Sequence, residues 1–327
     1  MTEITITTNK MNPMVDPNLH IWGLDVSIYL FLGGLTAGIL VIASLMILWK
    51  KSSAFNLATN RLILLAPILL SIGMFFLWLD LENQFKVWRF YATFRVTSPM
   101  SWGAWILLLI YPLSFLLILS TFRKGYPKVY AWLERKLQSF SFTAKHLGKF
   151  QRLFGFSEKH RELFAKIMVP VAVLLGIYTG ILLSAFGARP FWNTSLLGPL
   201  FLVSGLSTAA ALVILLSRKS EERHFFTRVD LGLIFVELAV LGLLIIGMLT
   251  SSLQQGKAVQ LILGGPLTAY FWVFIIGIGL LLPAFLKIIE LKGKEIPASI
   301  AASLVLLGGF VMRIIIVEAG QISTWIN

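Results

Sequence analysis

"IMVPVAVLLGIYTGILLSAFG", residues 167–187, runs for 21 positions without a charged side chain. A helix needs about 20 apolar residues to cross the hydrocarbon layer of a membrane, so this stretch is long enough to span it. Seven other apolar runs of at least 18 residues occur in the sequence, at 27–48, 62–79, 102–122, 196–216, 231–250, 268–286 and 298–317. The sequence therefore predicts eight transmembrane helices.

The composition points to an integral membrane protein. Hydrophobic residues make up 57% of the 327 residues and charged residues only 13%, which is too apolar for a soluble domain. The apolar runs are continuous and do not alternate with polar residues, so backbone hydrogen bonding in lipid requires helices and excludes a barrel. We expect an all-α fold with one domain over 1–327. Residues 1–26 lack the pattern of a cleavable signal peptide and are expected to form a tail outside the membrane.

The distribution of positive charge predicts the orientation. The loops after the first, third, fifth and seventh runs carry 21 of the 28 Lys and Arg residues. Cytoplasmic loops are enriched in these residues, so both termini are predicted to be periplasmic, in a bacterial inner membrane. The segment 123–166 is the most basic loop, and its mixture of aromatic and basic residues predicts amphipathic helices on the cytoplasmic surface, with partner docking as the alternative. The net charge of +13 then reflects topology and contact with anionic membrane lipid, and not nucleic-acid binding.

The residue types available for metal binding limit the redox chemistry of this protein. It contains no cysteine, so it can hold neither a thiolate-ligated iron–sulfur cluster nor a disulfide. All four histidines lie outside the predicted spans, which argues against a haem held between two helices: His20, His146, His160 and His224. If the protein transfers electrons, its own side chains are not the carriers.

Three acidic residues are candidates for proton transfer. An ionisable group at membrane depth costs free energy, so each such residue is a candidate for a functional role. Asp80 closes the second run at its outer end, where it either serves a site or is simply solvated. Glu237 lies inside the sixth run, with Asp230 about two turns below it on nearly the same face. Two acids stacked in this way could pass protons from the cytoplasm; alternatively, Asp230 is a helix-end residue and Glu237 a structural residue paired with a hydroxyl. Arg313 in the eighth run fits an ion pair, snorkelling to the interface or a substrate contact.

Two tyrosines and two groups of glycines mark the outer half of the predicted bundle. Tyr178 lies roughly 13 Å from the outer end of its helix, which is deep for an interfacial tyrosine. Tyr29 lies one turn into the first helix. The glycines in "FLGGLTAG" (31–38) and "GIYTG" (176–180) either allow tight helix packing or leave a slot for a flat ligand.

Six segments, in order and at the matching helix ends, resemble the NrfD/PsrC family of quinone-reactive membrane subunits, of the polysulfide-reductase type. They are "YLFLGGLTAG" (29–38), "WLDLENQFKVWRF" (78–90), "TSPMSWGAW" (97–105), "YTGILLSAFGARPFWN" (178–193), "LFLVSGLSTAAAL" (200–212) and "GGFVMRIIIVEAGQ" (308–321). The resemblance implies two four-helix bundles without haem that bind menaquinone or ubiquinone near the outer face. It also implies a periplasmic ferredoxin-like iron–sulfur subunit as partner and, usually, a molybdopterin catalytic subunit.

The resemblance also assigns site residues. Tyr178 matches a quinone hydrogen-bond donor, Asp80 matches the acidic residue that closes helix two, and 189–193 match the Arg-Pro-Phe-Trp-Asn element. Where some members have a histidine in helix one, this protein has Tyr29, so the second partner of the quinone is Tyr29, Asp25 or His20. Arg189 belongs either to the quinone site or to the docking surface.

The resulting hypothesis is quinol oxidation, or quinone reduction, in a slot between the first four helices, with Asp80 as the proton acceptor at the outer mouth. Proton uptake or pumping through Asp230 and Glu237 is a second hypothesis. From other classes, the protein could be a secondary transporter that uses Arg189 and Arg313, although matched broken helices are not evident, or a quinone-free structural anchor. Neither the terminal substrate nor the direction of electron flow follows from the sequence.

Overall fold

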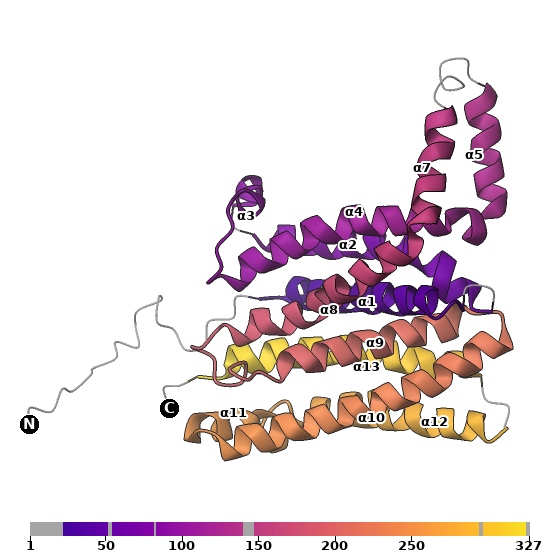
Figure 1. The fold of residues 1–327 in the computed structure, drawn as a ribbon. Helices are drawn as coiled ribbons and strands as arrows, with labels where there is room; N and C mark the ends of the chain where they lie inside the picture. Colours follow the sequence, from indigo (N-terminus) through magenta and orange to yellow (C-terminus); the bar gives the residue numbers. More distant parts are fainter. Residues whose placement is uncertain (1–21, 52–53, 82, 140–146, 294–296, 325–327) are drawn as a thin grey trace, which may run out of the picture.

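A computed structural model describes residues 22–51, 54–81, 83–139, 147–293 and 297–324, and these ranges are helical with short connections (Figure 1). Eight helices are long and apolar enough to cross a membrane: Leu24–Leu48, Leu57–Asp80, Pro99–Gly125, Arg161–Ser184, Leu197–Leu216, Ser220–Thr250, Tyr270–Leu291 and Ala298–Ile322. Each overlaps one of the eight apolar runs over most of its length. The predicted all-α fold with eight spans is confirmed.

Several spans extend beyond the apolar runs that predicted them. Helix α10 (Ser220–Thr250) begins more than two turns before the run at 231–250, and α8 (Arg161–Ser184) begins before the run at 167–187. The additional turns contain charged residues that the protein buries, so hydropathy does not detect them. Consequently Asp230 is not a helix-end residue: it lies inside α10 and is fully buried.

Two spans are not regular α-helices throughout. The second begins as a π-helical turn, η2 (Leu57–Arg61), passes through the 3₁₀ turn η3 (Leu62–Leu64) and continues as α2 (Leu65–Asp80). The seventh is a π-helix, η5 (Tyr270–Leu281), followed by α12 (Leu282–Leu291). Such segments change the direction of side chains relative to an α-helix and often occur near functional sites.

Helix α1 (Leu24–Leu48) is central and packs against α2, α8, α9 (Leu197–Leu216) and α13 (Ala298–Ile322). Glycines allow the closest approach: a Cβ atom on Gly38 of α1 would overlap the backbone of Gly205 in α9. Small residues at such crossings let helices pack tightly in lipid, where no hydrophobic effect drives them together. The glycines of "FLGGLTAG" therefore form a helix contact.

The two ends of the bundle carry different short elements (Figure 1). One end holds η4 (Gln84–Lys86), α3 (Arg89–Ala92) and α11 (Leu253–Leu263). The start of α1 and the end of α13 meet there, since the Trp22 amide donates to the Gln321 side chain at 2.7 Å. We call this the terminal end.

At the opposite end, α4 (Pro99–Gly125) leads into α5 (Pro127–Ser139), and α7 (Leu147–Lys159) leads into α8. Helices α5 and α7 lie side by side and run across the direction of the spanning helices (Figure 1). Aromatic rings join them, with Tyr130 of α5 stacked on Phe150 of α7. Arg123 anchors the pair to α4, because it bonds the Tyr130 hydroxyl at 2.8 Å and the Glu158 carboxylate at 3.3 Å.

Candidate functional site

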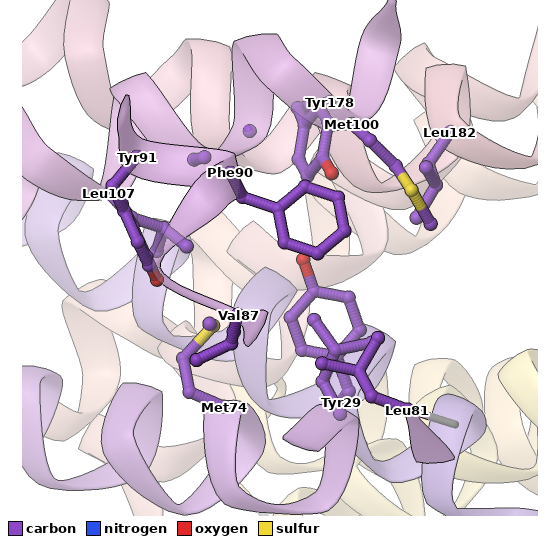
Figure 2. A pocket seen from close by; sticks show the side chains of 13 residues that line it. Tyr29, Met74, Leu81, Val87, Phe90, Tyr91, Met100, Leu107, Tyr178 and Leu182 are labelled. Carbon is purple, nitrogen blue, oxygen red and sulfur yellow. The ribbon is translucent and has the colours of Figure 1, made fainter. Parts of the chain in front are cut away.

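A narrow cavity with about 60 Å³ of free space lies near the terminal end, between α1, α2, α4 and α8 (Figure 2). The connection from α2 to α4, which includes α3, covers it. Most of its wall is apolar: Tyr29, Met74, Leu77, Leu81, Val87, Phe90, Tyr91, Met100, Gly103, Ala104, Leu107, Tyr178 and Leu182. We call this the tyrosine cavity.

Tyr29 and Tyr178 extend into this cavity from opposite walls, and their hydroxyl groups point toward each other (Figure 2). The two phenol groups are close enough to interact with each other. Their exposed fractions are only 2% and 6%. The cavity thus offers two phenolic groups on apolar walls, each able to donate or accept a hydrogen bond.

A glycine on α4 makes room for one of these tyrosines. A Cβ atom on Gly103 would overlap the ring and hydroxyl of Tyr178. By contrast, Gly176 and Gly180 do not clear space for a ligand: a Cβ on Gly176 would lie 2.6 Å from Leu202 of α9, and one on Gly180 would overlap the backbone at Leu197. The ligand-slot interpretation of "GIYTG" is therefore wrong, because those glycines face α9.

Helix α3 supplies a third phenol that the sequence did not single out. Tyr91 lines the cavity beside Phe90 (Figure 2). Burial raises the pKa of the Tyr91 phenol, so at neutral pH it remains a protonated donor. The only sequence signal was its place in an aromatic stretch after helix two.

The tyrosine cavity adjoins an open, more polar pocket with about 490 Å³ of free space, since Leu81 and Phe90 line both. Asp80, the last residue of α2, lies in this outer pocket with Lys86 and Arg89. Asp25, in the first turn of α1, is close enough to interact electrostatically with Asp80. His20, the third candidate at this end, lies outside the described residues.

A groove with about 560 Å³ of free space lies further along α2 and α4, away from the terminal end. Its walls are almost entirely apolar: Leu64, Pro67, Ile68, Ser71, Ile72, Phe75, Tyr111, Phe115 and Ile118. The Ser71 and Tyr111 hydroxyls bond each other across it at 3.0 Å. Exposed side chains such as Ile68 and Phe115 open it to the surrounding lipid.

Arg189 is held at a different place. Its guanidinium donates to the backbone carbonyls of Gln321 and Ser323, at 2.8 and 3.2 Å, where α13 ends. The neighbouring Trp192 indole donates to the Ile316 carbonyl at 2.8 Å and stacks on Trp22. The element 189–193 therefore joins the end of α8 to α13, and Arg189 does not line the tyrosine cavity.

The acidic candidates of α10 belong to a separate buried network. Asp230 accepts hydrogen bonds from Ser207 at 2.6 Å and from Lys287 of α12 at 2.5 Å, and both partners of the ion pair are buried. Glu237 is 3% exposed and interacts with Ser204 of α9.

Arg313 completes this network from α13. It is fully buried and donates to the Ser204 hydroxyl at 2.5 Å and to two backbone carbonyls. It therefore does not snorkel to the interface. The sequence analysis assigned Lys287 to a loop and so did not find it as a member of this network. The signal that could have placed Lys287 in a spanning helix is the apolar sequence that continues on both sides of it.

The arrangement has two chemical capacities. The tyrosine cavity can bind a flat, largely apolar molecule that carries hydrogen-bonding oxygens. The α10 network holds two carboxylates next to hydroxyls and cations, which are the groups that relay protons inside membranes. Among the described residues, no group of three or more His, Asp or Glu side chains is placed to hold a metal ion.

Comparisons with known proteins agree with the architecture. Residues 10–324 match the family model described as "Polysulphide reductase, NrfD". The sequence is 31% identical to the protein NrfD homolog of Haemophilus influenzae, over 95% of this protein and 97% of that one. It is 29% identical to protein NrfD of Escherichia coli, with 93% and 96% covered, and 28% identical to the C component of polysulfide reductase from Wolinella succinogenes, with 93% and 95% covered.

Proposed function

Because the chain belongs to the polysulphide reductase NrfD family and is a multi-pass membrane subunit of the bacterial inner membrane, we propose that it exchanges electrons between a membrane quinone and a partner subunit. In this function it oxidises quinol, or reduces quinone, in the tyrosine cavity. The quinone is menaquinone or ubiquinone, and the catalytic centre of the reductase lies on another subunit.

The observation that carries this proposal is the pair of facing hydroxyls in an apolar cavity. A quinone head group is a flat, apolar ring with two oxygens on opposite sides. The facing hydroxyls of Tyr178 and Tyr29 hold one oxygen and Tyr91 is the candidate for the other, while the methionine and leucine side chains pack on the ring. Burial of the phenols makes each hydrogen bond valuable, since an unpaired hydroxyl there is costly.

The outer pocket supports a role for Asp80 in proton transfer. Oxidation of a quinol releases two electrons and two protons, and the protons need an acceptor that reaches water. Asp80 is half-buried at the mouth and adjoins the cavity through Leu81 and Phe90. It would take a proton from the site and release it to solvent, with Asp25 as a nearby second carboxylate.

The groove between α2 and α4 supports lateral access from the bilayer. It lies about one turn along these helices from Met74, Leu77 and Leu107 of the cavity wall. Its apolar lining suits an isoprenoid tail, so a quinone could reach the tyrosines without leaving the lipid.

We infer the topology and partners from the same features. The terminal end faces the periplasm and the α5–α7 end faces the cytoplasm, as the distribution of Lys and Arg indicates. The spans form two groups of four, with α1 and α9 at the junction. A ferredoxin-like iron–sulfur subunit docks at the periplasmic end and passes electrons to or from a molybdopterin catalytic subunit; this fits a protein that has no cysteine to carry them.

The test is Tyr178→Phe in the purified complex. Removing the hydroxyl should lower quinol-dependent turnover by about tenfold or more, since one lost hydrogen bond to a reacting group costs roughly 1.5 kcal/mol. The matched control is Tyr270→Phe, an exposed tyrosine on η5. Turnover with an artificial electron donor that bypasses the membrane subunit should not change in either variant. Unchanged quinol-dependent turnover of Tyr178→Phe would contradict the assignment.

Proton translocation is a second candidate function, favoured by the buried network of α9, α10, α12 and α13. Its test is Glu237→Gln in proteoliposomes, with the ratio of protons moved to electrons transferred as the readout. An unchanged ratio would mean that Glu237 is structural. Copurification separates the remaining alternatives: iron–sulfur partners with bound quinone support the proposal, partners without quinone support a structural anchor, and a lone protein favours a transporter.

A further inference from the structure

A polar pocket with about 330 Å³ of free space lies at the opposite end of the molecule from the tyrosine cavity. The ends of α1, α4 and α7 and the start of α8 form its wall: Ile47, Lys50, Lys124, Glu158, Lys159, Arg161 and Glu162. We call it the basic pocket. None of these residues has a part in the proposed quinone chemistry.

The basic pocket carries a positive balance. Four of its seven lining residues are cations and two are carboxylates. One of the carboxylates, Glu158, is paired with Arg123 at 3.3 Å from outside the lining. Lys50, Lys124 and Lys159 are exposed, so their ammonium groups can turn toward a ligand. An anion bound in the pocket would neutralise this excess positive charge.

Arg161 indicates which kind of ligand is missing. It is only 9% exposed, and one end of its guanidinium donates to the Asn60 side chain at 2.7 Å. Its buried Nε–H has no hydrogen-bond partner among the described residues; the same holds for the Nε–H of Arg123, Arg223 and Arg313, but of these four arginines only Arg161 lines the basic pocket. A buried donor on a charged group is rarely left unpaired in a folded protein, and a phosphate oxygen is a natural acceptor for arginine.

The backbone around the pocket changes direction at two places. Helix α8 begins at Arg161, with one residue between it and the end of α7 at Lys159, so the junction of these two helices forms part of the pocket wall. Lys50 is the one described residue other than glycine with a positive φ, at 57°. That conformation is unfavourable for lysine, and it holds the residue where α1 ends, beside the pocket.

We propose that the basic pocket binds a phosphate group, presented by the head group of an anionic phospholipid such as phosphatidylglycerol or cardiolipin. The position favours a lipid as the source: Leu163 and Ile167 are 50% and 46% exposed on the first turns of α8, so a lipid-facing surface begins beside the pocket. Basic pockets between spanning helices at the cytoplasmic side are suited to such head groups. A free phosphate shares the same chemistry and is distinguished by the experiment.

The experiment compares two double variants of the full-length protein in detergent. Lys124→Gln with Lys159→Gln removes two cations of the pocket, whereas Lys128→Gln with Lys136→Gln removes two exposed cations from α5 outside it. All four lysines are exposed, so the core remains intact. Native mass spectrometry then measures retention of added cardiolipin, phosphatidylglycerol and phosphatidylcholine.

The pocket variant should bind cardiolipin about 25-fold more weakly than the wild type, from an attraction of roughly fivefold for each of the two cations, while the control variant stays within a few-fold. Equal loss in both variants, or equal retention of phosphatidylcholine, would overturn the proposal. In a third arm, inorganic phosphate is added to lipid-free protein. If phosphate at millimolar concentration binds the wild type and not the pocket variant, while cardiolipin does not discriminate between them, the site takes free phosphate and the lipid assignment is overturned.

Discussion

The position of the Tyr178 ring depends on the absence of a single methyl group on a neighbouring helix. Its ring occupies the space that a side chain at Gly103 would fill, and this contact sets how far the phenol reaches toward Tyr29. Local volume therefore controls the site, since helix interiors in a packed bundle tolerate little extra bulk.

Gly103→Ala should displace the Tyr178 ring and lower quinol-dependent turnover by about tenfold, at a cost in stability of roughly 1 to 3 kcal/mol from overpacking. The control is Gly242→Ala in α10, where an added Cβ meets no atom within 4 Å. That variant should keep its turnover, and its stability should be equal or slightly higher because alanine favours the helix. Wild-type turnover in Gly103→Ala would show that the position of the tyrosine is not critical.

The Asp230–Lys287 ion pair makes a second prediction about single residues. Asp230→Asn leaves a buried ammonium without its counter-ion, so the protein should lose about 3 to 5 kcal/mol of stability. Replacing both partners, as Asp230→Asn with Lys287→Met, should recover much of this loss because no unpaired charge remains. Thermal unfolding in detergent measures these two variants and the single variant Lys287→Met. If the double variant is as unstable as the sum of the single ones, the two residues are not coupled.

Among the structural elements, the turn between α8 and α9 joins parts of the protein that are distant in sequence. Arg189 donates to the Gln321 carbonyl, one of the last four of α13 that the helix itself leaves unpaired, and Trp192 donates to the Ile316 carbonyl further back in α13. This turn also touches Trp22 before α1, so it fixes the terminal end on which a partner would dock.

Arg189→Gln should therefore act on stability. Loss of two charge-assisted hydrogen bonds is expected to lower the free energy of unfolding by about 2 kcal/mol, with the KM for quinol unchanged. Thermal unfolding and steady-state kinetics of the same preparation separate the two effects. A raised KM with normal stability would instead place Arg189 in the quinone site.

For the molecule as a whole, the proposed orientation is testable because the sequence has no cysteine. A single cysteine at Gly148, on exposed α7, should be protected from a membrane-impermeant maleimide in intact spheroplasts and react in inverted vesicles. Ser251→Cys, at the end of α10, should show the reverse. The opposite pattern at both positions would invert the topology and with it the side of the quinone site.

The residues of the candidate site differ in how far the sequence anticipated them. Tyr29, Tyr178 and Asp80 were identified because each is polar at an unusual depth or at the end of an apolar run, which is visible along one helix. Gly103 and Tyr91 were not, since a glycine or an aromatic residue has an ordinary role in most membrane helices. For Arg189 the sequence predicts two alternative roles, and only its contacts with α13 show where its side chain lies.

The eight spans, the helical fold and the family follow from the sequence alone, because apolar length and ordered motifs are properties of short continuous segments. The pairings between helices required the folded structure. In the sequence, Lys287 is 57 residues from Asp230, Arg161 is 101 residues from Asn60, and Arg189 is 132 residues from Gln321. Such pairs depend on the rotation and register of one helix against another. No periodicity within a single helix contains that information, so the buried network and the basic pocket emerge only when the helices are packed.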